Sequence, residues 1–298
     1  MQACLESLLG QTCPAFELVV VDDGSTDGSW DVVESTIGRT GAQLLRLENG
    51  GVSRARNLGF AACRTNPRYL MFLDGDDVLL PDGLRILLAH MERHPAVSMC
   101  YSIPMLIDAD GVELGIDTDQ VRWAATGFGR RGLPDDELET PIEAIWAHFR
   151  AMPSACLVRR SAYEKTSGWD DSLCRPARPF QVEDKDMAIQ LALVGPVHRI
   201  PMQTFQYRVL PTVHRQSLYD GLRAIDRKWW NARVEPRVRG IVRHAIRFDS
   251  RVVMLDAARE LLSTLRSGSF GKALPASINL LRTMVRLASL PIRLKRRG

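Results

Sequence analysis

The sequence predicts an α/β protein with a Rossmann-like, mostly parallel sheet flanked by helices and a C-terminal helical extension. Through the first hundred residues, short apolar runs alternate with amphipathic stretches of about 10–15 residues, a pattern typical of βαβ units. From about Ser217 the pattern is helical to the end, with breaks near Pro236 and Pro291. These two observations predict an α/β domain over 1–217 and a separate helical region over 218–298.

The first half, 1–102, alternates strictly between the two kinds of element. Its apolar runs are long enough for strands and too short for helices. The last helix of this half is opened by Pro81 and ends before Pro95. Strands are predicted at 16–21, 44–47 and 69–73, and helices at 4–9, 27–37, 52–63 and 81–93.

The second half, 103–217, is less regular. Its strands are short, Asp108–Gly111 is predicted to form a hairpin turn, and 117–140 is a long polar loop of the kind that often carries function. Including one strand at the junction of the halves, strands are predicted at 97–101, 104–107, 112–116, 155–158, 197–200 and 204–209, and a helix at 184–194.

Composition narrows the class of protein. The 298 residues carry a net charge of +4, which is too small to indicate nucleic-acid binding by itself. Six cysteines without a CxxC pair predict free thiols in a reducing cytoplasm. The sequence predicts no signal peptide, and no run in it approaches the ~18–20 apolar residues that span a bilayer.

The C-terminus is basic, because Glu260 is the last acidic residue and eight lysines and arginines follow it. The predicted helix 277–290 has one apolar face with Arg282 and Arg286 opposite. With the basic run to 298, this segment could contact the inner face of an anionic membrane peripherally. The alternative is a helix that packs on the core and ends in a basic tail.

Two acidic motifs follow predicted strands. Asp74-Gly75-Asp76-Asp77 comes after the apolar run 69–73, and Asp22-Asp23 comes after 16–21. If both strands are parallel members of one sheet, five carboxylates meet at one edge, where ligands bind in open α/β sheets. That set suits Mg²⁺ or Mn²⁺ together with substrate oxygens. The alternative is helix N-capping, by Asp23 or Ser25 before one helix and by Asp76 or Asp77 before another.

Other acidic patterns carry less weight. Asp108/Asp110 sits in the predicted turn and Asp117/Asp119 in the polar loop, so both are expected to be structural or solvated. The stretch 23–34 nearly fits a calcium-binding EF-hand loop. A strand is predicted before it, however, where an EF-hand needs a helix.

Three further features are candidates for chemistry. The loop 48–57 offers glycine N–H groups with Arg54 and Arg56 for a diphosphate, or is a surface helix with exposed arginines. Glu183-Asp184 offers a carboxylate base for a sugar hydroxyl, or merely acids in a first helical turn. His214, after a strand, is a metal or phosphate ligand, or an exposed histidine.

Five motifs occur together in order. VVDDGSTDGS (20–29), GGVSRARNLG (50–59), FLDGDD (72–77), GWDDSL (168–173) with VED (182–184), and YR…H (207–214) resemble those of glycosyltransferase family 2, which has the glycosyltransferase A fold. The resemblance covers about 3–217. It implies an inverting, metal-dependent transfer from a nucleotide-sugar donor to a hydroxyl of a glycan, lipid-linked or other acceptor, with 1–102 on the donor side and 103–217 on the acceptor side.

The resemblance also implies roles for single residues. Asp184 resembles the catalytic base, with Glu183 beside it; the nucleotide is bound by Asp22, Asp23, Ser25, Arg56 and Asp74, and the Mg²⁺ or Mn²⁺ by Asp76, Asp77 and His214. Segments 117–140 and 152–178 are expected to shape the acceptor site. The alternatives are a nucleotidyltransferase of similar fold and a degenerate, non-catalytic homologue.

One departure concerns the N-terminus. Family members usually begin with an apolar strand and a turn, whereas here Met1-Gln2 leads directly into the helix that follows that turn. The first strand is therefore expected to be missing. An upstream translation start is favoured over true loss, because losing a central strand exposes unpaired backbone groups on its neighbours.

Overall fold

The computed structural model describes residues 1–13, 15–114, 139–140, 142, 145, 152–174, 182–209, 225 and 228–229. The chain divides into two compact units, 1–232 and 233–298, and all described residues belong to the first. Asp117/Asp119, His214 and the basic segment 277–298 lie outside the described residues. In the part of the chain that is described, no helix is long and apolar enough to cross a membrane.

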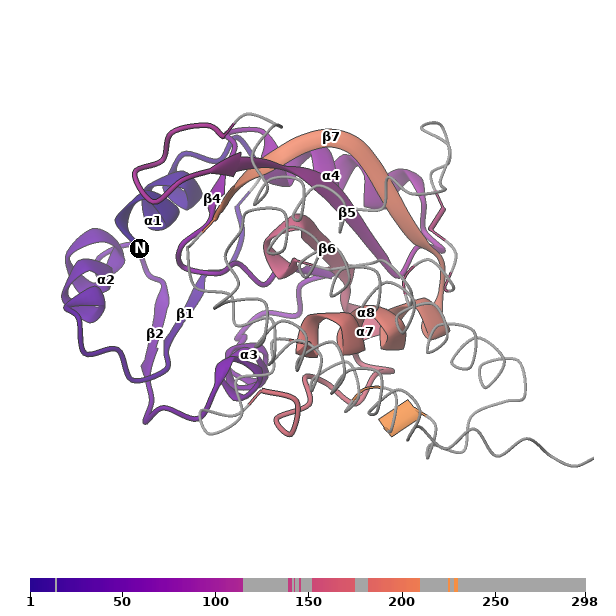
Figure 1. The fold of residues 1–298 in the computed structure, drawn as a ribbon, viewed down its shortest axis with the longest axis horizontal. Helices are drawn as coiled ribbons and strands as arrows, with labels where there is room; N and C mark the ends of the chain where they lie inside the picture. Colours follow the sequence, from indigo (N-terminus) through magenta and orange to yellow (C-terminus); the bar gives the residue numbers. More distant parts are fainter. Residues whose placement is uncertain are drawn as a thin grey trace, which may run out of the picture. The chain divides into compact units, whose positions relative to one another are not determined.

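The first part of the chain, residues 2–61, forms a small parallel sheet with helices against it (Figure 1). Strands β1 and β2 pair in parallel with Val19 opposite Gln43. Leu5, Val33 and Ile37, from α1 and α2, are almost fully buried and form a core with apolar side chains of the two strands. The elements are α1 (Gln2–Leu9), β1 (Val19–Asp22), α2 (Ser29–Ile37), β2 (Gln43–Arg46) and α3 (Val52–Ala61).

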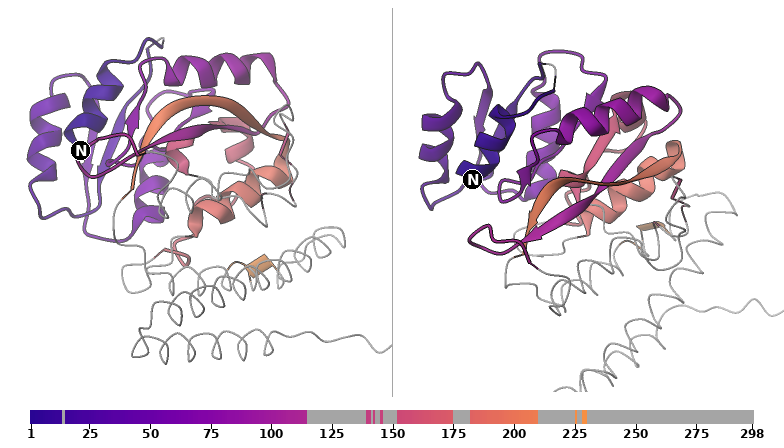
Figure 2. Two further views of the ribbon diagram at one scale, coloured as in Figure 1. Left: turned by 45° about the horizontal axis from the view of Figure 1, so that its top comes forward. Right: turned by 90° about the horizontal axis from the view of Figure 1, so that it is seen from above.

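A five-stranded sheet in the order β3-β6-β5-β7-β4 forms the rest of the described fold. Helix α4 packs against its two long strands, β5 and β7, which run side by side (Figure 2). The elements are β3 (Tyr69–Leu70), β4 (Val78–Leu79), α4 (Gly83–Arg93), β5 (Met99–Ile107), β6 (Cys156–Arg159), α7 (Arg160–Tyr163), α8 (Glu183–Val194) and β7 (Val197–Arg208), with a 3₁₀ turn at Pro153–Ala155.

The predicted α/β class with flanking helices is confirmed, while the strand pairing differs in detail. Of the pairs formed by the described strands, β1–β2 and β5–β7 are parallel, and β3–β6, β5–β6 and β4–β7 are antiparallel. The alternation of strands and helices that predicts parallel crossovers stops at α4. Beyond it, the sequence no longer places a helix between every two strands, and antiparallel pairs need none.

Two strands are longer than predicted. Strand β5 unites the predicted strands 97–101 and 104–107, and β7 unites 197–200 and 204–209. Proline removes a ladder hydrogen bond and therefore predicts a strand end. Pro104 is instead accommodated by register shifts between Ser102 and Pro104, where the β5–β7 ladder is irregular. The hairpin turn is confirmed: the Val112 carbonyl accepts a hydrogen bond from the Asp108 N–H, and Gly111 has a positive φ of 88°.

The described strands belong to two separate sheets. Among the described strands, β1 is paired with β2 alone and β3 with β6 alone. The expectation that Asp22-Asp23 and Asp74–Asp77 follow strands of one sheet is therefore wrong for the described residues, because their strands belong to different sheets. All six cysteines are free, as predicted.

Candidate active site

The loop after β1 is held by its own two aspartates. Asp22 is buried, accepts a hydrogen bond from the Ser25 N–H at 2.9 Å, and pairs with Arg46 at 3.4 Å. Asp23 accepts hydrogen bonds from the N–H groups of Gly50 and Gly51 at 2.9 and 2.8 Å, one on each carboxylate oxygen. The N–H groups that the sequence offers to a diphosphate therefore donate to Asp23. Strand β1 precedes this loop directly, which confirms the rejection of a calcium-binding helix-loop-helix.

The Asp74–Asp77 loop distributes its carboxylates over different environments. Asp74 is half-buried, Asp76 is exposed and Asp77 is 1% exposed. Asp77 accepts a hydrogen bond from the Arg208 N–H at 3.1 Å, which ties the loop to the end of β7. Burial, followed by the charges of Asp74 and Asp76, raises the pKa of Asp77 to about 7. Partial desolvation within the loop, followed by the Asp74 charge, also raises the pKa of Asp76, although its side chain is more exposed than that of Asp77.

Arg56 connects three of the predicted site carboxylates. From the middle of α3, its Nη2 donates to Asp74 at 2.7 Å, while Nη1 donates to Asp184 at 2.8 Å and lies 3.5 Å from Glu183. The guanidinium side chain is only 9% exposed. Arg56 is thus neither an exposed surface arginine nor free to bind a diphosphate with these two nitrogens. It brings the acidic loop after β3 against the start of α8.

Glu183 and Asp184 begin α8 and differ in access. The Glu183 side chain is 4% exposed, and its Oε2 is buried without a hydrogen-bond partner among the described residues. The Asp184 side chain is 26% exposed. Three carboxylates share one guanidinium, which leaves a net negative charge. Burial and the Glu183 charge accordingly raise the pKa of Asp184, although Arg56 opposes this shift.

The Gly168-Trp169 segment completes this cluster and could be located in sequence only through the GWDDSL motif. Trp169 stacks on Arg56, with the guanidinium carbon 4.4 Å from the ring centroid. The Asn57 side chain accepts from the Trp169 N–H at 3.0 Å and donates to the Trp169 carbonyl at 2.8 Å. Neither Asn57 nor Trp169 was predicted as a site residue. Asn57 follows Arg56 directly in GGVSRARNLG, which is the signal that could have found it.

Asp186, two residues after Asp184, has a different role from its neighbours. It is 1% exposed and accepts hydrogen bonds from Gln190, from Lys228 at 2.8 Å and from the Trp229 indole at 2.9 Å. Lys228 also pairs with Asp170 at 2.8 Å. Residues beyond the predicted domain end at 217 are therefore bound to α8.

Asp108 is structural, as predicted. Its side chain accepts hydrogen bonds from the N–H groups of Asp110 and Val112, both at 2.9 Å, which closes the hairpin turn. Asp117/Asp119, the remaining pair expected to be structural, and His214, the remaining predicted metal ligand, lie outside the described residues.

The sequence matches the family model for glycosyl transferase family 2 over residues 1–166, which is more than half of the chain. The chain belongs to glycosyl transferase family 2. The predicted resemblance to this family is therefore confirmed.

A relative within this group is the chondroitin synthase of Escherichia coli, which is 26% identical over 198 residues. The match covers 66% of this chain but 25% of that enzyme, so this family 2 chain spans about a quarter of that relative's length.

Two solved structures have a similar fold. S. aureus TarS, residues 1–349 in complex with UDP, superposes with a TM-score of 0.58 at 19% identity, covering 84% of this chain and 66% of that one. The Pyrobaculum calidifontis mannosyltransferase in complex with GDP-Man and Mn²⁺ has a TM-score of 0.58 at 18% identity, covering 96% and 76%. These likenesses confirm the glycosyltransferase A fold of this family 2 member.

Proposed function

We propose that this chain transfers a sugar from a nucleotide-sugar donor to an acceptor hydroxyl with inversion at the anomeric carbon, and that Asp184 is the base. The observation that supports this most is the Arg56 bridge. It joins Asp74, which is predicted to contact the donor, to Glu183 and Asp184, which are predicted to do the chemistry. A transfer reaction needs both functions next to each other.

Donor binding is assigned to the loops after β1 and β3. Each oxygen of the Asp23 carboxylate accepts one N–H bond, and an ionised carboxylate has about four acceptor sites, so capacity remains for the nucleotide base. Asp22, Ser25 and Asp74 complete this proposed donor site. Arg56 acts on it through Asp74. The solved neighbours that bind UDP or GDP-Man are consistent with a nucleoside diphosphate leaving group.

The residues fit a divalent cation. The cluster is net negative, and oxygen ligands are those that Mg²⁺ and Mn²⁺ prefer. Asp76 is exposed, whereas Asp77 is buried and already accepts a bond from the Arg208 N–H, so we assign the ligand role to Asp76 and a positioning role to Asp77. His214 remains a proposed further ligand. When bound, the cation would neutralise charge on the leaving diphosphate.

Asp184 is suited to accept the proton of the acceptor hydroxyl. Its raised pKa makes it a stronger base than an ordinary carboxylate, and its partial exposure leaves one side open to a substrate. Arg56 holds one oxygen of Asp184 in a fixed position. Two buried atoms in the cluster, Glu183 Oε2 and Trp169 Nε1, have no hydrogen-bond partner among the described residues, which is consistent with a polar ligand beside them.

The proposed acceptor is a glycan or a lipid-linked hydroxyl. The chondroitin synthase relative supports a glycan, and the basic segment 277–298 supports contact with an anionic membrane near a lipid-linked acceptor. Co-sedimentation with anionic vesicles tests the membrane contact. Binding at low salt that is lost when the chain ends at residue 276 is expected, and equal binding by both chains would contradict it.

The experiment is a donor screen followed by NMR. Purified protein is incubated with a panel of nucleotide sugars and Mn²⁺, Mg²⁺ or EDTA. Release of a nucleoside diphosphate that requires the cation, with inverted anomeric configuration in the product, is the expected result. Retention of configuration would contradict the base assignment. In a separate incubation with nucleoside triphosphates and sugar 1-phosphates, release of pyrophosphate would indicate a nucleotidyltransferase. Absence of turnover in both incubations would indicate a non-catalytic homologue.

A further inference from the structure

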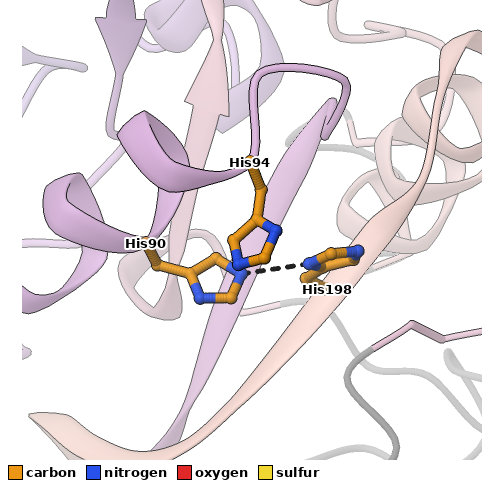
Figure 3. A group of neighbouring side chains, drawn as sticks. All are labelled: His90, His94 and His198. Atoms are coloured by element: carbon orange, nitrogen blue, oxygen red, sulfur yellow. Dashed lines mark hydrogen bonds between the residues drawn. The ribbon is translucent and has the colours of Figure 1, made fainter.

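Three histidines meet at the end of α4, away from the carboxylates of the candidate active site. His90 and His94 belong to the last turn and C-cap of α4, one helical turn apart, and His198 is the second residue of β7 (Figure 3). One ring nitrogen from each lies within 4.8 Å of the other two. His90 is buried and the other two are half-buried.

We propose that His90, His94 and His198 form a binding site for a divalent transition metal of the Zn²⁺ class. Imidazole nitrogen suits Zn²⁺, Ni²⁺ and Cu²⁺, whereas Mg²⁺ and Mn²⁺ favour oxygen ligands. Zn²⁺ binds histidine nitrogen at about 2.0–2.1 Å in a tetrahedron, which separates neighbouring ligand atoms by about 3.4 Å. His90 Nε2 and His198 Nδ1 are 3.1 Å apart, so a small rotation of the rings brings them to that spacing.

The end of α4 that carries two of these histidines is held in place by Arg159. Residues four apart on a helix share one face, which places His90 and His94 together. The Arg159 guanidinium donates to the carbonyls of Met91 and His94 at 3.0 and 3.1 Å and so holds the end of α4. Preorganisation of this kind lowers the cost of ordering three ligands.

An acidic residue lies on a segment next to the three histidines. Glu139 pairs with His198 across an isolated β-bridge, and directly opposed residues on neighbouring strands project to the same face. Burial and the nearby His94 lower the pKa of His198, and the Glu139 carboxylate charge opposes this shift. Three imidazoles with a carboxylate or a water as the fourth ligand is a common zinc coordination set.

The site is distinct from the proposed Mg²⁺ or Mn²⁺ site. His198 stands at the start of β7 and Arg208, which contacts Asp77, at its end. Ten residues of extended strand span up to about 33 Å along the chain. A metal at the histidines would therefore join α4 to the beginning of β7 and stabilise the fold without touching the proposed reacting atoms.

Calorimetric titration of the EDTA-treated full chain with Zn²⁺ tests the proposal. One saturable site is expected in the unaltered protein. His94→Gln and His198→Gln should each weaken Zn²⁺ binding by more than roughly 10–100-fold, the cost of losing only a supporting residue of a metal site. At a hundredfold excess over Kd, Zn²⁺ should raise Tm by about 5–10 °C.

Matched controls separate this site from the others. Arg93→Gln changes an exposed side chain on the same helical turn and should leave Zn²⁺ binding intact. Asp76→Asn weakens the proposed Mg²⁺ or Mn²⁺ site and should also leave Zn²⁺ binding intact. Both histidine variants are checked by circular dichroism; if His198→Gln does not fold, His94→Gln decides. Co²⁺ should give tetrahedral bands without a thiolate charge-transfer band.

Three results would each overturn the site. The first is no saturable Zn²⁺ binding in the unaltered chain. The second is a Zn²⁺ affinity in both folded histidine variants equal to that of the unaltered chain, and the third is a thiolate band that assigns the metal to the free cysteines.

Discussion

At the scale of single residues, Arg56 determines the character of the candidate site. One guanidinium lies against Asp74, Glu183 and Asp184 and is nearly buried. Carboxylates at this density repel one another, and burial adds a desolvation cost to each. Arg56 offsets part of that cost and leaves a negative remainder, which is what a divalent cation would neutralise.

Arg56→Met should destabilise the fold by about 3–5 kcal/mol at alkaline pH, because three buried or half-buried carboxylates lose their common partner. The loss should be smaller in mild acid, where the carboxylates take up protons instead. The loss of stability in Arg56→Lys should lie between those of the unaltered chain and Arg56→Met, because the charge is kept but an ammonium cannot donate to two carboxylates in the planar geometry of a guanidinium. Urea unfolding at two pH values measures this. Arg54→Met, an exposed arginine on the same helix, is the control, and a similar loss in both variants would contradict the account.

Asp77 makes stability depend on pH. Its folded pKa of about 7 exceeds the ordinary carboxylate value near 3.8, so between these values the folded state holds the proton that the unfolded state has released. Its contribution therefore falls as pH rises from about 4 to 7. In metal-free protein, the stability difference between Asp77→Asn and the unaltered chain should grow in favour of the variant over this window. A difference that stays constant would contradict the raised pKa.

At the scale of elements, α3 and the Gly168-Trp169 segment behave as one unit. Asn57 makes two hydrogen bonds to the Trp169 backbone, and Gly168 has a positive φ of 74°, a conformation that favours glycine. This segment carries the indole that stacks on Arg56. The orientation of Arg56 thus depends on a loop more than a hundred residues away in sequence.

Asn57→Ala should cost about 2–4 kcal/mol, because one backbone N–H and one carbonyl lose their partners at a half-buried site. Turnover should fall with stability, since Trp169 would no longer be held over Arg56. Urea unfolding and donor consumption measure the two effects. Asn66→Ala, at an exposed asparagine, is the control and should change neither. Normal turnover in Asn57→Ala would contradict the positioning role.

How far the sequence predicts the fold depends on how local each signal is. The helices α1 to α4 and α8 follow from periodicity and lie within a few residues of the predicted bounds. The union of two predicted strands into β5 cannot be predicted from periodicity, because the bulge that accommodates Pro104 depends on the partner strand. The same holds for the site: acidic motifs identify Asp74 and Asp184, but only the tertiary structure brings Arg56, 128 residues from Asp184, between them.

At the scale of the whole molecule, the first compact unit extends past the predicted domain end at 217 to residue 232. Lys228 pairs with Asp170 and with the buried Asp186, and so ties the end of this unit to α8. Burial opposes the charge of Lys228, but its partners prevail and raise its pKa.

Lys228→Met should destabilise the unit by about 2–3 kcal/mol, less than for a fully buried pair because Lys228 is 28% exposed. Thermal unfolding of the full chain measures this. Lys165→Met removes an exposed lysine and should be near neutral. Equal Tm values for the two variants would mean that residues after 217 do not support α8.

We propose that the donor-binding carboxylate Asp74 meets Glu183 and Asp184 across Arg56, and that Asp184 is the base. The most direct test compares Asp184→Asn with the unaltered chain in Mn²⁺, measuring turnover and donor Kd together. Turnover should fall by roughly 10²–10⁴-fold, the usual contribution of a positioned base, while the donor Kd stays within about twofold. Turnover that persists, or a Kd that rises in parallel with the loss of turnover, would contradict it.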